Sequence, residues 1–162
     1  MKAKFLKDTN VHREMYRLFA QHDIPSQRIE LLAWTTEVRQ HMEIYHRVDI
    51  SLDPFPFNGG TTSYESLCMG VPLVTLAGNN FVSRMGIRQL MNVGLSHLIA
   101  RTPDEYVDIA VRLAGDLNQL KQLRAKLRTR ILQSPLTDGK RLARNLEATY
   151  RTMWRRWCER TA

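Results

Sequence analysis

VDISLDPFPFNGGTTSYESLCMGVPLVTL, residues 48–76, predicts a strand, a glycine loop, a helix and a second strand in that order. Apolar residues alternate with polar ones as far as Leu52, which is the pattern of a half-buried strand. Pro54 and Pro56 then end the strand, because proline cannot donate a hydrogen bond to a neighbouring strand. The second apolar run, residues 73–76, follows a proline and suits a parallel sheet that is covered on both faces.

The turn between these strands carries two adjacent glycines, Gly59 and Gly60. Glycine adopts positive φ and approaches a ligand without a Cβ in the way, so we expect both features here. Thr62 and Glu65 have the spacing of a capping box, which predicts a helix from about Thr62 to Met69. Such a helix would begin directly at the glycine loop.

A helix that begins at a glycine loop is able to bind an anion at its N-terminus. The first N–H groups of a helix have no partner inside it, and the helix dipole adds partial positive charge there. A diphosphate at Gly60 to Thr62 would be held by backbone donors and hydroxyl groups, so a nucleotide is the natural ligand. The alternative is that Asn58, Gly59 and Gly60 form an ordinary turn and that Thr62 only caps a helix. The local pattern does not choose between these readings.

The rest of the chain alternates helices with short strands. Apolar spacing and capping signals predict helices over residues 10–22, 37–47, 83–93 and 117–132, with a further helix from Thr102, and short strands over 28–32 and 98–100. This alternation is typical of a doubly wound, mostly parallel α/β sheet, which binds ligands at the carboxyl ends of its strands. The glycine loop would lie at such an end.

The stretch LDPFPFNGGTTSYESLCMGVPLVTLAGNNFVSRMG, residues 52–86, resembles the C-terminal signature of the protein O-linked N-acetylglucosamine transferases, the SPINDLY-like glycosyltransferase family. The similarity continues through residues 93–117 and 134–154 and back to 28–34 and 41–53, and so covers nearly the whole chain. It implies the Rossmann-like C-terminal half of a GT-B type glycosyltransferase. We expect a single UDP-sugar-binding domain over residues 1–162 that lacks its first strand-helix unit and has a basic C-terminal helix at about 140–160.

The resemblance assigns roles to residues of the glycine loop. Thr61 and Thr62 match threonines that hold the diphosphate of the donor, and Gly59 and Gly60 shape the loop around them. Glu65 matches an acidic position that receives the ribose hydroxyls, which suits a carboxylate because it only accepts hydrogen bonds.

Two further positions come from the N-terminal part of the chain. His41 matches a histidine beside the uridine diphosphate, and Thr36, with its neighbour Thr35, falls where backbone groups meet the uracil edge. The chain departs from some family members twice: Gly60 replaces a histidine, and Val38 replaces a basic residue three positions before His41. Each departure removes a group that would neutralise phosphate charge.

The function that the resemblance implies is inverting transfer of N-acetylglucosamine from UDP-GlcNAc to Ser or Thr of a protein acceptor. We expect no cofactor, no metal ion and no catalytic residue within this chain. The N-terminal catalytic half and the tetratricopeptide repeats would be missing from this chain, so the isolated chain would lack turnover. The alternative is a non-catalytic binding or scaffold module that retains the fold. A cytoplasmic protein is expected, because Lys2, Lys4 and Lys7 interrupt any apolar leader segment at the N-terminus.

The positive charge of the chain is concentrated at its C-terminal end. Residues 121–162 hold twelve Lys and Arg against three acidic residues, whereas residues 1–120 hold twelve against thirteen. A basic helix is able to bind nucleic acid or an anionic membrane, but we expect neither, because apolar residues form one stripe along it and arginines the other face. That stripe predicts an exposed apolar patch or self-association of the chain; it consists of Leu142, Leu146, Tyr150, Met153 and Trp157.

Overall fold

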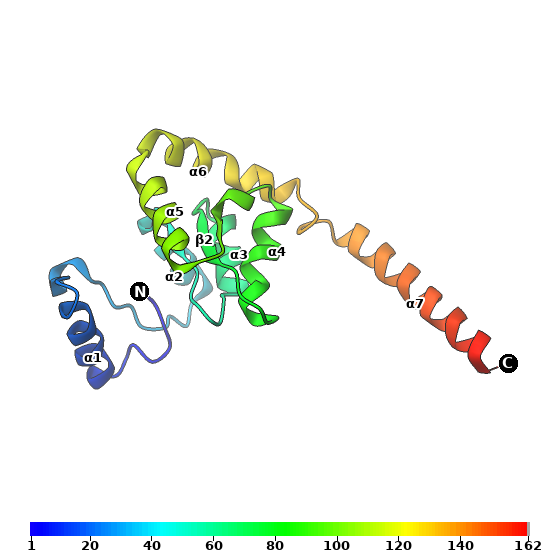
Figure 1. Cartoon of the computed structure of the whole chain (residues 1–162), viewed down its shortest axis with the longest axis horizontal. Coiled ribbons are helices and arrows are strands. Elements are labelled where there is room, and N and C mark those ends of the chain that lie inside the picture. The colour runs from blue at the N-terminus through cyan, green and yellow to red at the C-terminus, as the bar shows by residue number, and fades with distance from the viewer. Residues whose placement is uncertain (162) are drawn as a thin grey trace. The chain divides into compact units, whose positions relative to one another are not determined.

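The computed structural model describes residues 1–161, which form two compact units, Met1–Arg47 and a second unit that begins at Val48. Figure 1 shows the chain coloured from its N-terminus to its C-terminus. The glycine loop and the sheet belong to the second unit.

The second unit is built on a parallel sheet with the strand order β1-β2-β3. The strands are β1 (Ser51–Leu52), β2 (Leu73–Leu76) and β3 (Ile99–Ala100). Ser51 pairs with Leu73, and Thr75 pairs with Ile99. All four residues of β2 are buried, as expected for a central strand covered on both faces. The predicted doubly wound parallel α/β fold is confirmed.

Helices connect and cover these strands. α3 (Thr61–Cys68) joins β1 to β2, and the short helix η3 (Val82–Arg84) with α4 (Met85–Asn92) joins β2 to β3 by way of η4 (Ser96–Leu98). α5 (Pro103–Gly115) and α6 (Leu117–Leu132) follow β3. α4 and α5 pack on β2, and α3 packs against α6. The core between them is made of Leu67, Leu73, Val74, Leu76, Leu90, Val93, Leu95, Leu98, Ala100, Ile109, Leu113, Leu120, Leu127 and Ile131.

Helix boundaries follow the signals in the sequence. Thr102 Oγ1 accepts a hydrogen bond from the Glu105 N–H at 3.2 Å, and Pro103 occupies the first helical position of α5. Gly70 and Gly94 end α3 and α4 with φ of 76° and 69°, a conformation that glycine adopts at low cost.

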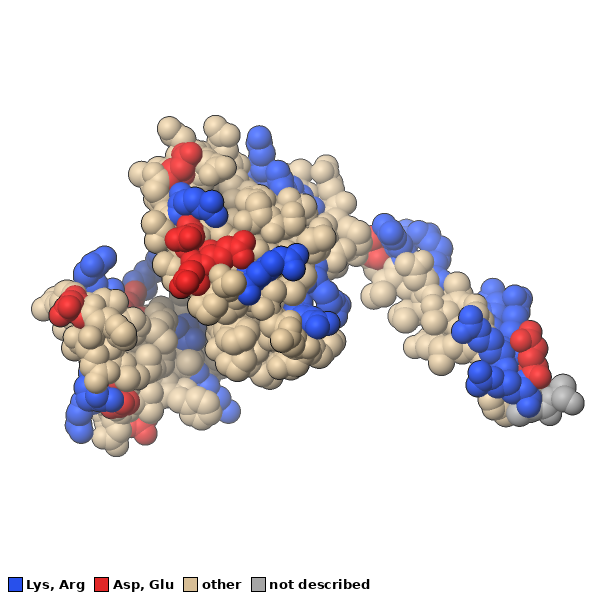
Figure 2. All heavy atoms as spheres, in the orientation of Figure 1, with Lys and Arg blue, Asp and Glu red and all other residues tan. Residues whose placement is uncertain are grey.

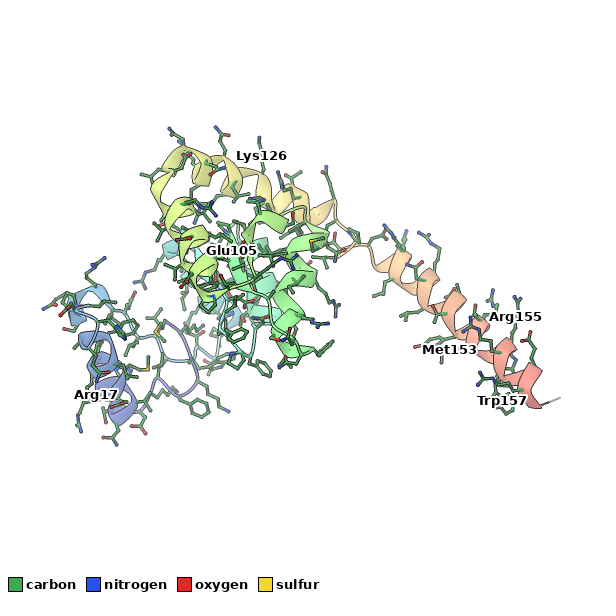
Figure 3. All side chains as sticks on the ribbon, viewed as in Figure 1. Arg17, Glu105, Lys126, Met153, Arg155 and Trp157 are labelled. Atoms are coloured by element: carbon green, nitrogen blue, oxygen red, sulfur yellow. The ribbon has the colours of Figure 1, made fainter. Side chains whose placement is uncertain are left out.

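α7 (Gly139–Thr161) is a long amphipathic helix with an exposed apolar stripe. Figure 2 shows Lys and Arg gathered along it, and in Figure 3 Met153 and Arg155 project from different sides of the helix. Trp154 and Trp157 are 63% and 56% exposed and stack on each other with ring centroids 5.2 Å apart. The predicted exposed patch is therefore present. Over residues 1–161, none of the helices combines the length and the apolar character needed to cross a membrane.

The first unit contains α1 (Thr9–Ala20), η1 (Ser26–Arg28), α2 (Val38–Glu43) and η2 (Ile44–Arg47). Asp8 caps α1 by accepting a hydrogen bond from the Asn10 N–H at 2.7 Å. The predicted strand over residues 28–32 is wrong. Residues 26–28 form a short helical turn after Pro25, and the only pairing among the described residues of this segment is a single parallel bridge between Lys2 and Leu32.

Candidate functional site

The glycine loop lies at the carboxyl edge of the sheet, between β1 and α3. Gly60 is the residue before the first turn of α3, with φ of −95° and ψ of −89°. The predicted capping by Thr62 is therefore wrong, because Thr61 and Thr62 are the first two residues of the helix itself. Both threonines are exposed at the point where the helix dipole is positive.

The glycines are needed here for close packing rather than for positive φ. Among residues 1–161, the glycines with positive φ are Gly70 and Gly94, so that part of the expectation for Gly59 and Gly60 is wrong. A Cβ at Gly59 would lie 2.2 Å from Ser63 Oγ, and one at Gly60 would lie 2.8 Å from Met85 Cε. The loop thus packs tightly against side chains of α3 and α4.

A buried carboxylate, Asp53, organises the loop from behind. Its Oδ1 accepts hydrogen bonds from the Gly59 N–H at 2.8 Å and the Ser63 hydroxyl at 3.0 Å, and its Oδ2 accepts one from the Thr75 hydroxyl at 2.7 Å. Asp53 is only 1% exposed. Burial raises the pKa of Asp53, whereas its hydrogen bonds to Thr75, Gly59 and Ser63 lower it. This one side chain links β1, the loop, α3 and β2.

Tyr106 of α5 completes this arrangement. Its hydroxyl group donates to the backbone carbonyl of Asp53 at 2.9 Å. Burial, together with the nearby charge of Asp53, raises the pKa of Tyr106 to about 12, so the phenol stays protonated and remains a donor. Residues 53 and 106 are far apart in the sequence, and no local pattern predicts this contact.

Gln89 of α4 holds the other side of the loop. Its Nε2 donates to the Gly60 carbonyl at 2.8 Å, and the same carbonyl accepts the Tyr64 N–H at 3.2 Å. The N–H and C=O of a trans peptide point in opposite directions, so the Thr61 N–H faces away from Gln89. Within residues 1–161, the N–H groups of Gly60 and Thr61 make no hydrogen bond to the protein.

Two buried acceptor atoms flank the loop without a protein partner in the described residues. They are Oδ1 of Asn58 and Oε1 of Gln89. Asn58 is fully buried, and its Nδ2 donates to the Pro54 carbonyl at 2.9 Å. Orphan acceptors of this kind call for a water molecule or for a donor on a ligand. The loop therefore offers unpaired donors to an anion and has unpaired acceptors beside them.

The first unit contains its own polar cluster around His41. Lys2 Nζ contacts Nδ1 of His41 and donates to Thr35 Oγ1 at 3.0 Å. Trp34 stacks on the His41 ring with centroids 6.0 Å apart, and Tyr45 meets the ring edge-on at 5.6 Å.

The residues that contact one another around His41 differ in part from those that the sequence predicted. Thr36 is exposed, two residues before α2, and it is Thr35 that joins the cluster. Sequence reasoning missed Lys2, a basic residue next to His41. No pattern near His41 predicts this contact, because Lys2 lies 39 residues away in the sequence.

The predicted site residues are therefore divided between the two units. Gly59, Gly60, Thr61, Thr62 and Glu65 lie on one continuous loop-helix segment of the second unit. Glu65 is one helical turn beyond Thr61 and so lies on the same side of α3. His41 and Thr36 belong to the first unit.

A surface hollow of about 440 Å³ lies near the other end of β1. Its lining residues are Asp49, Ile50, Ala114, Leu117, Leu120, Lys121 and Arg124. Asp49 and Ile50 precede β1, whereas the glycine loop follows it, so the hollow and the loop lie at opposite edges of the parallel sheet.

The sequence profile of Glycosyl transferase family 41 matches residues 7–146. The chain belongs to glycosyl transferase family 41. The family 41 chain is 42% identical over 159 residues to the probable UDP-N-acetylglucosamine–peptide N-acetylglucosaminyltransferase SPINDLY of Petunia hybrida. It is 46% identical over 136 residues to the SPINDLY protein of the same description from Hordeum vulgare. The resemblance drawn from residues 52–86 is confirmed.

A solved structure supports the fold of this family 41 chain. The chain matches the structure of a mutant of the Thermobaculum terrenum O-GlcNAc transferase with a TM-score of 0.92 and 35% sequence identity, and the match covers 99% of the chain. The chain spans 31% of that structure, 17% of the Petunia protein and 14% of the Hordeum protein. The fold is thus that of a Rossmann-like half of a GT-B glycosyltransferase.

Proposed function

We propose that this chain is the sugar-nucleotide-binding part of an inverting glycosyltransferase that transfers N-acetylglucosamine from UDP-GlcNAc to Ser or Thr of proteins. The observation that carries the proposal is the glycine loop, whose Gly60 and Thr61 amides have no acceptor among residues 1–161 and precede the exposed hydroxyls of Thr61 and Thr62. The names of the relatives, which include UDP-N-acetylglucosamine and a peptide, support the choice of donor and acceptor.

The share of catalysis that falls to this chain is charge stabilisation. As the acceptor hydroxyl oxygen bonds to the anomeric carbon, the bond from that carbon to the diphosphate breaks and negative charge gathers on the departing UDP. Fixed N–H groups and hydroxyls at the start of α3 would stabilise that charge without having to reorganise. The acid-base groups lie outside this chain in the proposal, so the isolated chain has no turnover.

The remaining ligand roles extend this proposal. Glu65 would accept the ribose hydroxyls, and His41 and Thr36 would contribute to recognition of the uridine diphosphate. These three roles come from the family resemblance. We also propose that residues 1–162 act as one UDP-sugar-binding domain, which works with a catalytic half and tetratricopeptide repeats elsewhere in the full protein.

Calorimetric titration with UDP tests the site assignment. Thr61→Ala and Thr62→Ala should each weaken UDP binding by about 2- to 10-fold, the range for loss of one hydrogen bond. Thr9→Ala is the matched control, because Thr9 is also an exposed first residue of a helix. Its affinity for UDP should equal that of the wild type. Equal affinities for all four proteins would remove the diphosphate from this loop.

A further inference from the structure

The glycine loop is held by the protein on both sides before any ligand arrives. On one side the Gly59 N–H donates to Asp53 Oδ1 at 2.8 Å, and on the other the Gly60 carbonyl accepts from Gln89 Nε2 at 2.8 Å. Asp53 reaches the loop from the end of β1 and Gln89 from α4, so the two contacts come from different layers of the fold. Together they fix the peptide group that precedes Gly59 and the one that follows Gly60, so the peptide between the two glycines is held at both ends.

The surroundings of Asp53 show that its carboxylate is built into the fold. Oδ2 is held by the Thr75 hydroxyl at 2.7 Å, and Oδ1 also accepts from Ser63 at 3.0 Å. A Cβ at Gly86 would lie 2.4 Å from Oδ2, so α4 approaches the carboxylate as closely as a glycine allows. Burying a carboxylate is costly unless it is fully hydrogen-bonded, and an apolar residue would pack here without that cost. The acceptor is therefore used for something other than packing.

The consequence of the two contacts is a set direction for the free amides. With the Gly60 carbonyl bound to Gln89, the N–H of the same peptide, that of Thr61, points to the opposite side. With the Gly59 N–H bound to Asp53, the donors left for a ligand are those of Gly60 and Thr61. A loop that already has its bound shape does not lose affinity to ordering when the ligand binds.

We infer that Asp53 and Gln89 are positioning residues that hold the Gly60 and Thr61 amides in a diphosphate-binding orientation. Neither side chain touches the diphosphate in this scheme: Asp53 acts through the Gly59 amide and Gln89 through the Gly60 carbonyl. The inference rests on the proposed function, since the ligand is the diphosphate of that same site. It adds two residues that the family resemblance did not assign.

Conservative and disruptive variants of Asp53 and Gln89 should differ in their effect on UDP binding. Asp53→Asn keeps an acceptor for Gly59 and Ser63, and the Thr75 hydroxyl is able to rotate and accept from the amide instead. Asp53→Ala removes the acceptor. Gln89→Met keeps an uncharged side chain of similar size, but it removes the donor to the Gly60 carbonyl.

The experiment is an NMR titration of the 162-residue chain and its variants with UDP and, separately, with uridine. Asp53→Ala should weaken UDP binding by about 10- to 100-fold, the range for hydrogen bonds involving charged groups, and Gln89→Met should weaken it by about 2- to 10-fold, the range for one neutral hydrogen bond. Asp53→Asn should stay within about threefold of the wild type, and all variants should bind uridine equally, because uridine has no phosphate. Asp49→Asn, which removes a carboxylate with an 82% exposed side chain from before β1, is the charge-matched control and should bind UDP normally.

The inference is overturned if Asp53→Ala and Gln89→Met bind UDP as the wild type does, if they lose uridine and UDP affinity together, or if Asn at position 53 does not restore binding. Gln89→Met decides the matter if Asp53→Ala does not fold. Hydrogen exchange of the Gly59 amide without ligand separates this inference from the proposed function. Slow exchange in the wild type and Asp53→Asn with fast exchange in Asp53→Ala supports the positioning role even if the wild type fails to bind UDP. Equal exchange in all three refutes it.

Discussion

Gly86→Ala gives the sharpest test of the packing behind the glycine loop. Gly86 lies in α4, where replacing glycine by alanine normally stabilises a helix by about 1 kcal/mol. Here the new Cβ would lie 2.3 Å from Thr75 Oγ1 and 2.4 Å from Asp53 Oδ2. These two atoms are buried and hydrogen-bonded to each other at 2.7 Å, so neither is able to withdraw without breaking that bond.

The expected net effect of Gly86→Ala follows from the three contributions. Overpacking costs about 1–3 kcal/mol, and losing a hydrogen bond to a charged group costs about 1.5–3 kcal/mol. After the helix gain of about 1 kcal/mol is subtracted, the free energy of unfolding should fall by about 1.5–5 kcal/mol. Urea denaturation followed by far-UV circular dichroism measures this change.

Gly115→Ala is the matched control for this prediction. Gly115 is the last residue of α5, and a Cβ there would meet no atom within 4 Å. The same chemical change should therefore leave stability unchanged or raise it by about 0.5–1 kcal/mol. If Gly86→Ala proves as stable as Gly115→Ala, the close packing of α4 against Asp53 is wrong.

Further predictions concern Tyr106, Asp53 and α7. Tyr106→Phe should lower the free energy of unfolding by about 0.5–1.5 kcal/mol, because one hydrogen bond to the Asp53 carbonyl is lost; a urea midpoint equal to that of the wild type would contradict this. Because the folded-state pKa of Asp53 is raised above its ordinary value of 3.8, this group's contribution to stability falls as pH rises from 3.8 to that folded pKa and is constant above it. The stability of Asp53→Asn relative to the wild type should therefore increase with pH over that window, and stability curves that stay parallel would show that the pKa is not raised. Replacing both Trp154 and Trp157 by Ser should abolish concentration-dependent association in sedimentation velocity, since these side chains are among the exposed apolar residues of α7; a wild type that stays monomeric at high concentration would refute the self-association.

The elements that the sequence predicted well are those with strong local signals. α6 begins and ends at the residues predicted, 117 and 132, because its apolar spacing spans four turns without interruption. Thr102 and Pro103 mark the start of α5 by chemistry that acts over three residues. The start of α3 was misplaced by one residue, because Gly60 rather than Thr62 precedes its first turn.

The sequence predicted where the candidate site lies, but not the long-range hydrogen bonds that hold it. Residues 58–62 were recognised as a loop that leads into a helix, since glycines and threonines at that spacing act locally. The hydrogen bonds of Asp53 to Gly59, Ser63 and Thr75 were not predicted. Lys2 next to His41, 39 residues away, was not foreseen either.

The sequence alone thus determined the parallel α/β fold and the place of the glycine loop, because both depend on spacing and turn chemistry within a few residues. Its resemblance to known glycosyltransferases over residues 52–86 determined the family. Only the tertiary structure decided which amides of that loop are left for a ligand. That choice depends on Asp53 at the end of β1 and Gln89 on α4, which lie 6 and 29 residues from the loop groups they hold and are brought there by the packing of β2 between the helices. Hydrogen bonds between distant segments carry no periodicity or turn signal, so they become visible only once the core has formed.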